Sequence, residues 1–193
     1  MTLDEIWAKA REMMGPNCRV CPECDGRGCK GKIPGVGSMG DGSAWTACVE
    51  YLRRVKIRMD TIHEPWEPDA STTLFGVRLA APLCLAPIGG LNGHNYNGAM
   101  STADWSMMAV TGAARAGILP FTGDGAPGQL KDGLEAAKAN GGLDVATVKP
   151  WRDNGKLIAQ AQRCAEAGCP AVACDIDAAA FANMGSAVKT LSS

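Results

Sequence analysis

Four short apolar stretches decide the fold of this chain: LCLAPIGG at residues 83–90, ILPFTGDG at 118–125, VATVKPW at 145–151 and AVACDID at 171–177. None of them alternates apolar with polar residues, which is typical of strands buried on both faces of a parallel sheet. Their first residues are 35, 27 and 26 positions apart, and these distances leave room for a helix between successive strands. The pattern therefore predicts repeated βα units.

The segments between these stretches carry the start and stop signals of helices. Ser101 and Asp153 can each cap a helix N-terminus with a side-chain oxygen. The segments ARAG at 114–117 and AEAG at 165–168 end in a glycine suited to the left-handed residue after a helix, and AKANGG at 137–142 has the same role. We therefore expect each strand to be followed by one helix that ends just before the next strand.

The residues that precede the first unit predict a different organisation. The pattern indicates a helix over 2–14, a second helix over 43–57 and a small hairpin over 71–79. We accordingly predict two domains: a helical and cysteine-rich extension at 1–70, and a barrel portion at 71–193.

The predicted fold class is α/β, specifically a TIM (β/α)8 barrel. A complete barrel takes roughly 250 residues, and this chain has 193, so we expect the extension and about four βα units, the first half of a barrel. A four-stranded open sheet is the alternative, which the short spacing disfavours. Half a barrel leaves two strand edges unpaired, so we expect either that the natural product continues beyond Ser193 or that this piece pairs with something.

The charge composition excludes some classes of function. Lys plus Arg number 19 and Asp plus Glu 20, for a net charge of −1. This balance argues against a protein that binds nucleic acid or membrane surfaces through bulk charge. No apolar run approaches the length of a transmembrane helix, and the N-terminus lacks the features of a signal peptide. We expect a cytoplasmic protein.

Glycines and polar residues follow each apolar stretch, at the strand ends where barrel enzymes hold their chemistry. Glycine there lets a flat ligand approach the backbone. Lys149 precedes Pro150, so its backbone is extended, and its side chain points either into the barrel mouth or toward the helices. In the mouth, its charge could stabilise an anionic cofactor ring or hold a substrate carboxylate. We therefore name Lys149 as the candidate catalytic residue.

Together, the segments TTLFGVRLAAPLCLAPIGGL, RAGILPFTGDG, VATVKPW and AVACDIDAA resemble the FMN-dependent α-hydroxy-acid dehydrogenase/oxidase family. The resemblance covers roughly residues 34–183 and is best over 71–178. It implies an FMN-bearing barrel that removes a hydride from the α-carbon of a small 2-hydroxy acid and yields the 2-oxo acid, as a homo-oligomer when full length. It also implies that FMN is bound by Pro87, Ile88, Gly89, Thr122, Gly123, Thr147 and Asp175.

The chain departs from the family pattern at three places. Lys149 stands where better-known members carry a substrate-binding tyrosine, and Ile88-Gly89 replaces a commoner Thr-Ala pair. An N-terminal tyrosine of those members has no clear match around Ile33. These departures indicate a divergent subgroup.

Several functional groups of the family would lie after Ser193: the proton-abstracting histidine, the carboxylate-binding arginines, the fifth-strand lysine and the phosphate loops. The two histidines of this chain, His63 and His94, do not match that base. We therefore expect the isolated chain to be inactive. A flavin-dependent enzyme of the isopentenyl-diphosphate isomerase type is an alternative within the same fold.

Four cysteines cluster before the second helix: Cys18, Cys21, Cys24 and Cys29, with the spacing C-x2-C-x2-C-x4-C. Thiolates at such spacing can ligate zinc or an iron–sulfur cluster. The run differs from that of bacterial ferredoxins, and zinc ribbons use two separated pairs, so we predict a reduced loop without a metal. A non-enzymatic metal-binding or redox module remains the alternative function.

Overall fold

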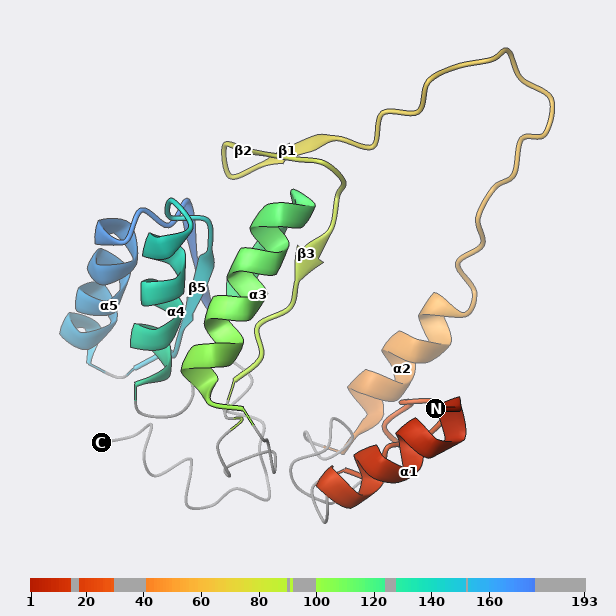
Figure 1. Ribbon diagram of the computed structural model, residues 1–193, viewed down its shortest axis with the longest axis horizontal. Coiled ribbons are helices and arrows are strands. Elements are labelled where there is room, and N and C mark those ends of the chain that lie inside the picture. Colours follow the sequence, from red (N-terminus) through yellow and green to blue (C-terminus); the bar gives the residue numbers. More distant parts are fainter. Residues whose placement is uncertain are drawn as a thin grey trace. The chain divides into compact units, whose positions relative to one another are not determined.

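The computed structural model describes residues 1–14, 18–29, 41–89, 91, 100–123, 128–151 and 153–175. The chain divides into two compact units, one built on the residues up to Asp69 and the other on those from Ala70 onward. Figure 1 traces the elements of both along the chain.

The first unit contains two helices, α1 at Leu3–Met14 and α2 at Ser43–Leu52. A capping box opens α1: the Glu5 amide donates to Thr2 Oγ1 at 3.3 Å, and the Thr2 amide donates to Glu5 Oε2 at 2.7 Å. Helix α2 ends five residues before the predicted position 57. The β-branched Val55 and Ile57 are poor helix formers, and the following residues to 71 form neither helix nor strand.

The second unit is built on a parallel sheet. Its strands are β3 at Cys84–Leu85, β4 at Leu119–Thr122, β5 at Val145–Val148 and β6 at Ala171–Cys174. They pair in the order β3-β4-β5-β6, every pair parallel. Strands that neighbour each other in sequence also neighbour each other in space, without the reversal of order that marks a doubly wound sheet. This sequential order is that of a (β/α)8 barrel.

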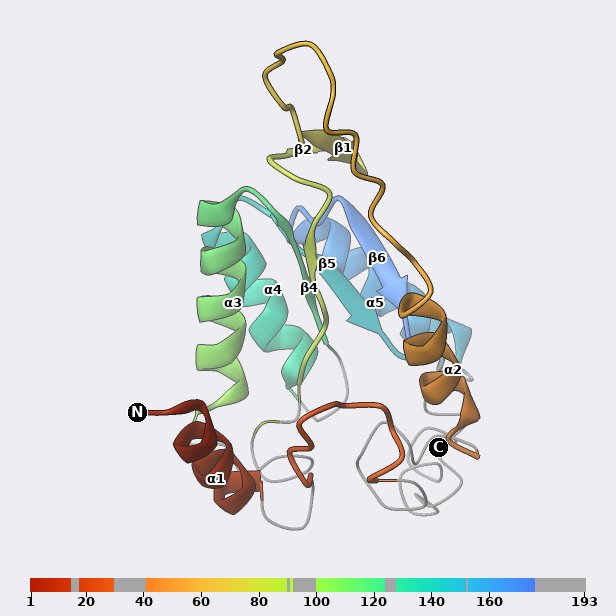
Figure 2. The same cartoon turned by 90° about the vertical axis from the view of Figure 1, so that its right-hand side faces the viewer.

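Three helices alternate with these strands: α3 at Thr102–Ala116, α4 at Gln129–Ala139 and α5 at Asn154–Glu166. Both predicted caps are confirmed. Ser101 Oγ accepts from the Asp104 amide at 3.0 Å, and Asp153 Oδ1 accepts from the Gly155 amide at 2.8 Å. All three helices lie on the same side of the strands (Figure 2).

The sheet has a separate apolar core on each face. On the helix side, Ala146 and Val148 of β5 pack with Leu130, Leu134, Cys164 and Ala167 of the α4 and α5 segments. On the other side, Leu119 and Val145 pack with Leu79. Because successive side chains of a strand point to opposite faces, β5 contributes to both cores, and all four of its residues are buried.

Leu79 belongs to the predicted hairpin, which is confirmed as β1 at Thr72–Leu74 and β2 at Val77–Leu79. Phe75 and Gly76 form the turn with φ of 51° and 78°. Two consecutive positive φ values define a type I′ turn, whose twist suits a two-residue hairpin. The hairpin therefore covers the strand-entry end of the face that carries no helix.

The predicted α/β class with parallel βα units is confirmed. The order of the strands and the one-sided helix layer agree with part of a TIM barrel. The strands within the described residues do not close into a barrel, so the complete barrel stays a prediction. No described helix is long and apolar enough to cross a membrane.

Helix α4 packs very closely on β4, because Gly133 faces Thr122. A Cβ atom on Gly133 would lie 2.5 Å from Thr122 Oγ1 and 2.9 Å from Thr122 Cβ. On α3, Gly112 offers a matched contrast, since a Cβ there meets nothing within 4 Å.

We predict opposite effects for the two alanine variants. Gly133→Ala should lower the free energy of unfolding by about 1–3 kcal/mol through overpacking. Gly112→Ala should raise it by about 0.5–1 kcal/mol, because alanine loses less backbone entropy in a helix. Urea unfolding followed by circular dichroism measures both. Equal effects would contradict the tight α4–β4 contact.

Candidate functional site

The ends of β3 and β4 lie against each other. A Cβ atom on Gly123 would be 3.5 Å from the carbonyl carbon of Ile88 and 3.6 Å from the amide nitrogen of Gly89. The glycine at 123 therefore keeps the two backbones in contact. Pro87 and Ile88 are exposed on this edge, with Ile88 40% exposed, so their backbone and side chains are accessible to a ligand.

Gln129 belongs to this site and was missed by the sequence analysis. It is the first residue of α4 and only 4% exposed. Its Nε2 atom occupies the place where a Cβ of residue 89 would stand, at 1.0 Å, and lies 3.2 Å from the place of a Cβ on Gly123. The Gln129 side-chain amide thus fills the space between the ends of β3 and β4. With the amide in this place, position 89 has no room for a side chain and must be glycine.

The ends of β5 and β6 are joined by charge. Lys149 Nζ and Asp175 Oδ2 form an ion pair between side chains that are 12% and 30% exposed. The Asp175 amide also donates to the Val148 carbonyl at 2.9 Å, one step beyond the strand. The structure therefore brings together two predicted site residues that lie 26 positions apart, and the lysine charge has a carboxylate beside it.

Thr147 presents a buried hydroxyl. Its side chain is 3% exposed, and within the described residues its Oγ1 has no hydrogen-bond partner. Strand alternation places Thr147 on the same face as Val145, away from the helices. Leaving a buried hydroxyl unpaired is costly, which makes Thr147 a fitting donor or acceptor for a bound ligand.

The Thr122 side chain faces the helices instead. Its Oγ1 donates to Asp144 Oδ2 at 2.6 Å, and both side chains are buried. A contact between Thr122 and a cofactor would therefore involve its backbone. Asp144 was not anticipated: it directly precedes β5, in a position where an aspartate usually belongs to a solvated loop.

Burial raises the pKa of Asp144 from its ordinary value to about 7, and hydrogen bonds from Thr122 and the Val145 backbone offset only part of this rise. A charged carboxylate at this position loses its hydration and receives too few hydrogen bonds from the protein to compensate. Across the described residues, its Oδ1 meets no hydrogen-bond partner.

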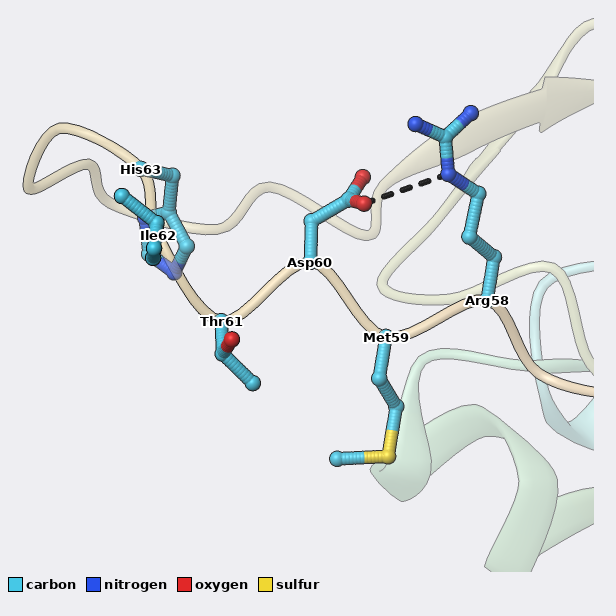
Figure 3. A pocket seen from close by; sticks show the side chains of 6 residues that line it. All are labelled: Arg58, Met59, Asp60, Thr61, Ile62 and His63. Atoms are coloured by element: carbon cyan, nitrogen blue, oxygen red, sulfur yellow. Dashed lines mark hydrogen bonds and ion pairs between the residues drawn. The ribbon is translucent and has the colours of Figure 1, made fainter.

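The remaining residues singled out by the sequence lie elsewhere. Asp153 caps α5, while Asp124, Asp177 and His94 lie outside the described residues. His63 belongs to an exposed stretch of the first unit that also lines a surface hollow, with Arg58 paired to Asp60 at 3.2 Å (Figure 3). Six consecutive residues, 58–63, line this hollow, so it contains none of the predicted site residues.

The strand ends suit a flavin by their chemistry. They offer glycine backbone for the flat face of a ring system, a buried hydroxyl that no described residue engages and a cation beside its counter-ion. Flavin rings carry carbonyl and ring-nitrogen groups that accept and donate hydrogen bonds, and reduction gives them negative charge that a nearby cation stabilises.

A comparison with protein-family models matches residues 36–192 to the FMN-dependent dehydrogenases. The chain belongs to this family. Members of the family bind FMN, so FMN is the cofactor of this protein and an FMN-dependent oxidoreductase its general class. No curated protein matches the chain.

We predict that Asp144 makes stability depend on pH. The pKa is higher in the folded than in the unfolded state, so the folded state binds the proton more tightly. This contribution is fully present below about pH 4 and is lost as the pH rises through 7, up to about 4 kcal/mol in all. Urea unfolding at about pH 5 and about pH 8 measures it.

The matched variant is Asp144→Asn, which can still accept from Thr122 but does not titrate. Its stability should change less between the two pH values than that of the unsubstituted protein. An identical pH dependence in both proteins would contradict the assignment.

For the ion pair, we predict strong coupling between its partners. Lys149→Met and Asp175→Asn should each cost about 1–3 kcal/mol, because each removes the opposite charge from beside a half-buried charged partner. The double variant should lose less than the sum of the two. Strictly additive losses, measured by urea unfolding, would show that the pair contributes nothing.

Proposed function

We propose that this protein oxidises a small 2-hydroxy acid to the corresponding 2-oxo acid. Its membership in the FMN-dependent dehydrogenases supports the redox class, and the resemblance of the strand ends to the hydroxy-acid subgroup supports the substrate. The observation that carries the proposal is the Lys149–Asp175 pair beside Thr147, at the strand edge where barrel enzymes bind substrate.

In this proposal, the strand ends hold the cofactor in three ways. The backbone of Pro87, Ile88 and Gly89 would contact the cofactor ring, with Gly123 keeping the neighbouring strand close. The Thr147 hydroxyl would supply a hydrogen bond to the cofactor. Thr122 contributes through its backbone, since its hydroxyl is bonded to Asp144.

Lys149 and Asp175 have different electrostatic roles in this proposal. FMN supplies the two-electron acceptor for the hydride that leaves the substrate α-carbon. Lys149 stabilises negative charge, either on the ring or on the substrate carboxylate. Asp175 positions the ammonium group at the strand ends, and it reduces the cost of holding a cation that is only 12% exposed.

The diphosphate isomerase alternative is less well supported. A diphosphate carries several negative charges and calls for a cluster of cations. On the described strand ends, the cation is Lys149, and a carboxylate already accompanies it. A substrate with a single carboxylate suits this charge balance better.

The test is anaerobic mixing of small 2-hydroxy acids with the purified FMN-loaded protein, expressed from its complete natural reading frame. We expect at least one acid to bleach the visible flavin absorbance as the 2-oxo acid forms. Lys149→Met should lower kcat/KM by about 100-fold or more, the usual loss when a preorganised electrostatic group is removed. Bleaching by none of the acids would contradict the substrate class.

Two further variants separate function from stability. Lys156→Met is a matched control, because Lys156 lies on α5 with its ammonium 4.6 Å from the Trp151 ring centre, and it should retain the rate. In Lys149→Met with Asp175→Asn, much of the lost stability should return but not the turnover. Recovery of turnover in that double variant would contradict the role of Lys149.

A further inference from the structure

The cysteine-rich loop of the first unit, residues 18–29, is held in place by helix α2. The Trp45 indole nitrogen donates to the Cys24 carbonyl at 2.9 Å, and Thr46 Oγ1 donates to the Asp25 carbonyl at 3.0 Å. Both bonds end on backbone oxygens within or next to the cysteine run. The loop backbone is therefore fixed where it carries the third cysteine.

Two ion pairs add to this attachment. Arg27 Nη2 lies 2.7 Å from Glu50 of α2, and Arg53, the residue directly after α2, pairs with Glu23 of the loop. These exposed pairs contribute little energy individually. Together with the two hydrogen bonds, they show that α2 carries a matched set of partners for this loop, which an arbitrary surface loop would not need.

The loop is also folded around its own sulfur atoms. The Val20 amide points at Cys18 Sγ, with 3.3 Å between nitrogen and sulfur, and Val20 takes a positive φ of 47°. A Cβ atom on Gly28 would lie 2.7 Å from Cys21 Sγ, so the second cysteine packs on the residue directly before the fourth. Amide groups directed at sulfur and glycine beside it are features that let thiolates gather.

The four cysteines span only twelve residues of this loop. In their present positions, no three His, Cys, Asp or Glu side chains of the described residues are arranged as metal ligands. Four thiolates could converge fully only with a cation to offset their repulsion, and structural metal sites commonly complete their folding when the metal binds.

We propose that Cys18, Cys21, Cys24 and Cys29 form a four-thiolate site for a soft metal, either a zinc ion or an iron centre. The α2 contacts preset the loop, and the metal draws the sulfur atoms together. For zinc, each thiol donates a sulfur lone pair to the ion and gives its proton to solvent, so about four protons are released per ion and no electron is transferred. The site is structural and does not depend on the proposed hydroxy-acid oxidation.

The experiment titrates Co²⁺ into the full chain after reduction and chelation under anaerobic conditions. We expect a sulfur-to-cobalt charge-transfer absorbance that saturates at one ion per chain, with Zn²⁺ displacing the cobalt. Cys24→Ser should weaken metal binding by at least about tenfold. Losing a residue that only supports a metal ligand already lowers metal affinity by about 10- to 100-fold. Cys48→Ser is the matched control, since Cys48 is an exposed thiol of α2 outside the loop, and it should bind normally.

Further measurements identify the bound metal and define the results that would overturn the proposal. Zinc in the anaerobically purified protein identifies a zinc site, whereas iron with visible absorbance identifies an iron centre. A chain that holds neither metal and gives no cobalt absorbance overturns the proposal, as does Cys24→Ser binding as tightly as Cys48→Ser. If Cys24→Ser does not fold, alkylation of the unsubstituted protein decides: Zn²⁺ should protect the four loop thiols, and their full labelling would overturn the site.

Discussion

The hydrogen bond from the Asp175 amide to the Val148 carbonyl extends the β5–β6 ladder one residue past the strands. The rest of the candidate site depends on this parallel register. It aligns the strand ends at one edge, so that Lys149 and Asp175 meet as an ion pair, and strand alternation then turns Thr147 to the face without helices. With antiparallel pairing, the same side chains would lie at opposite edges of the sheet.

Small residues make this register possible, because the layers have to approach closely. Gly133 accommodates Thr122 between α4 and β4, and a Cβ on Gly142 would lie 2.5 Å from the Gly168 carbonyl oxygen. The second contact joins the turns that lead into β5 and β6. A chain with only 5% aromatic residues thus gains its packing from close approach of backbones rather than from large side chains.

Much of the fold could be predicted from the sequence because its signals are local. The Thr2–Glu5 box, the Ser101 cap and the turn at Gly76 each involve residues within a few positions of one another. The site was harder to predict from the sequence, because its contacts join separate segments. The partner of Lys149 is 26 residues away, Gln129 reaches back to Gly89, and the direction of Thr122 depends on which residue of β4 begins the alternation. A run of apolar residues does not reveal which of its side chains face the helices.

The charges at the ends of β5 and β6 can be understood as one feature. Lys149 and Asp175 place a cation and an anion on neighbouring strand ends. A lysine alone, only 12% exposed, would have carried an uncompensated charge at a strand end that is costly to desolvate. The aspartate on the adjacent strand offsets part of that cost and keeps the summed charge of the pair at zero. The pair nevertheless leaves a fixed dipole at the strand ends, and in the proposed function this dipole favours an anionic substrate group on the lysine side.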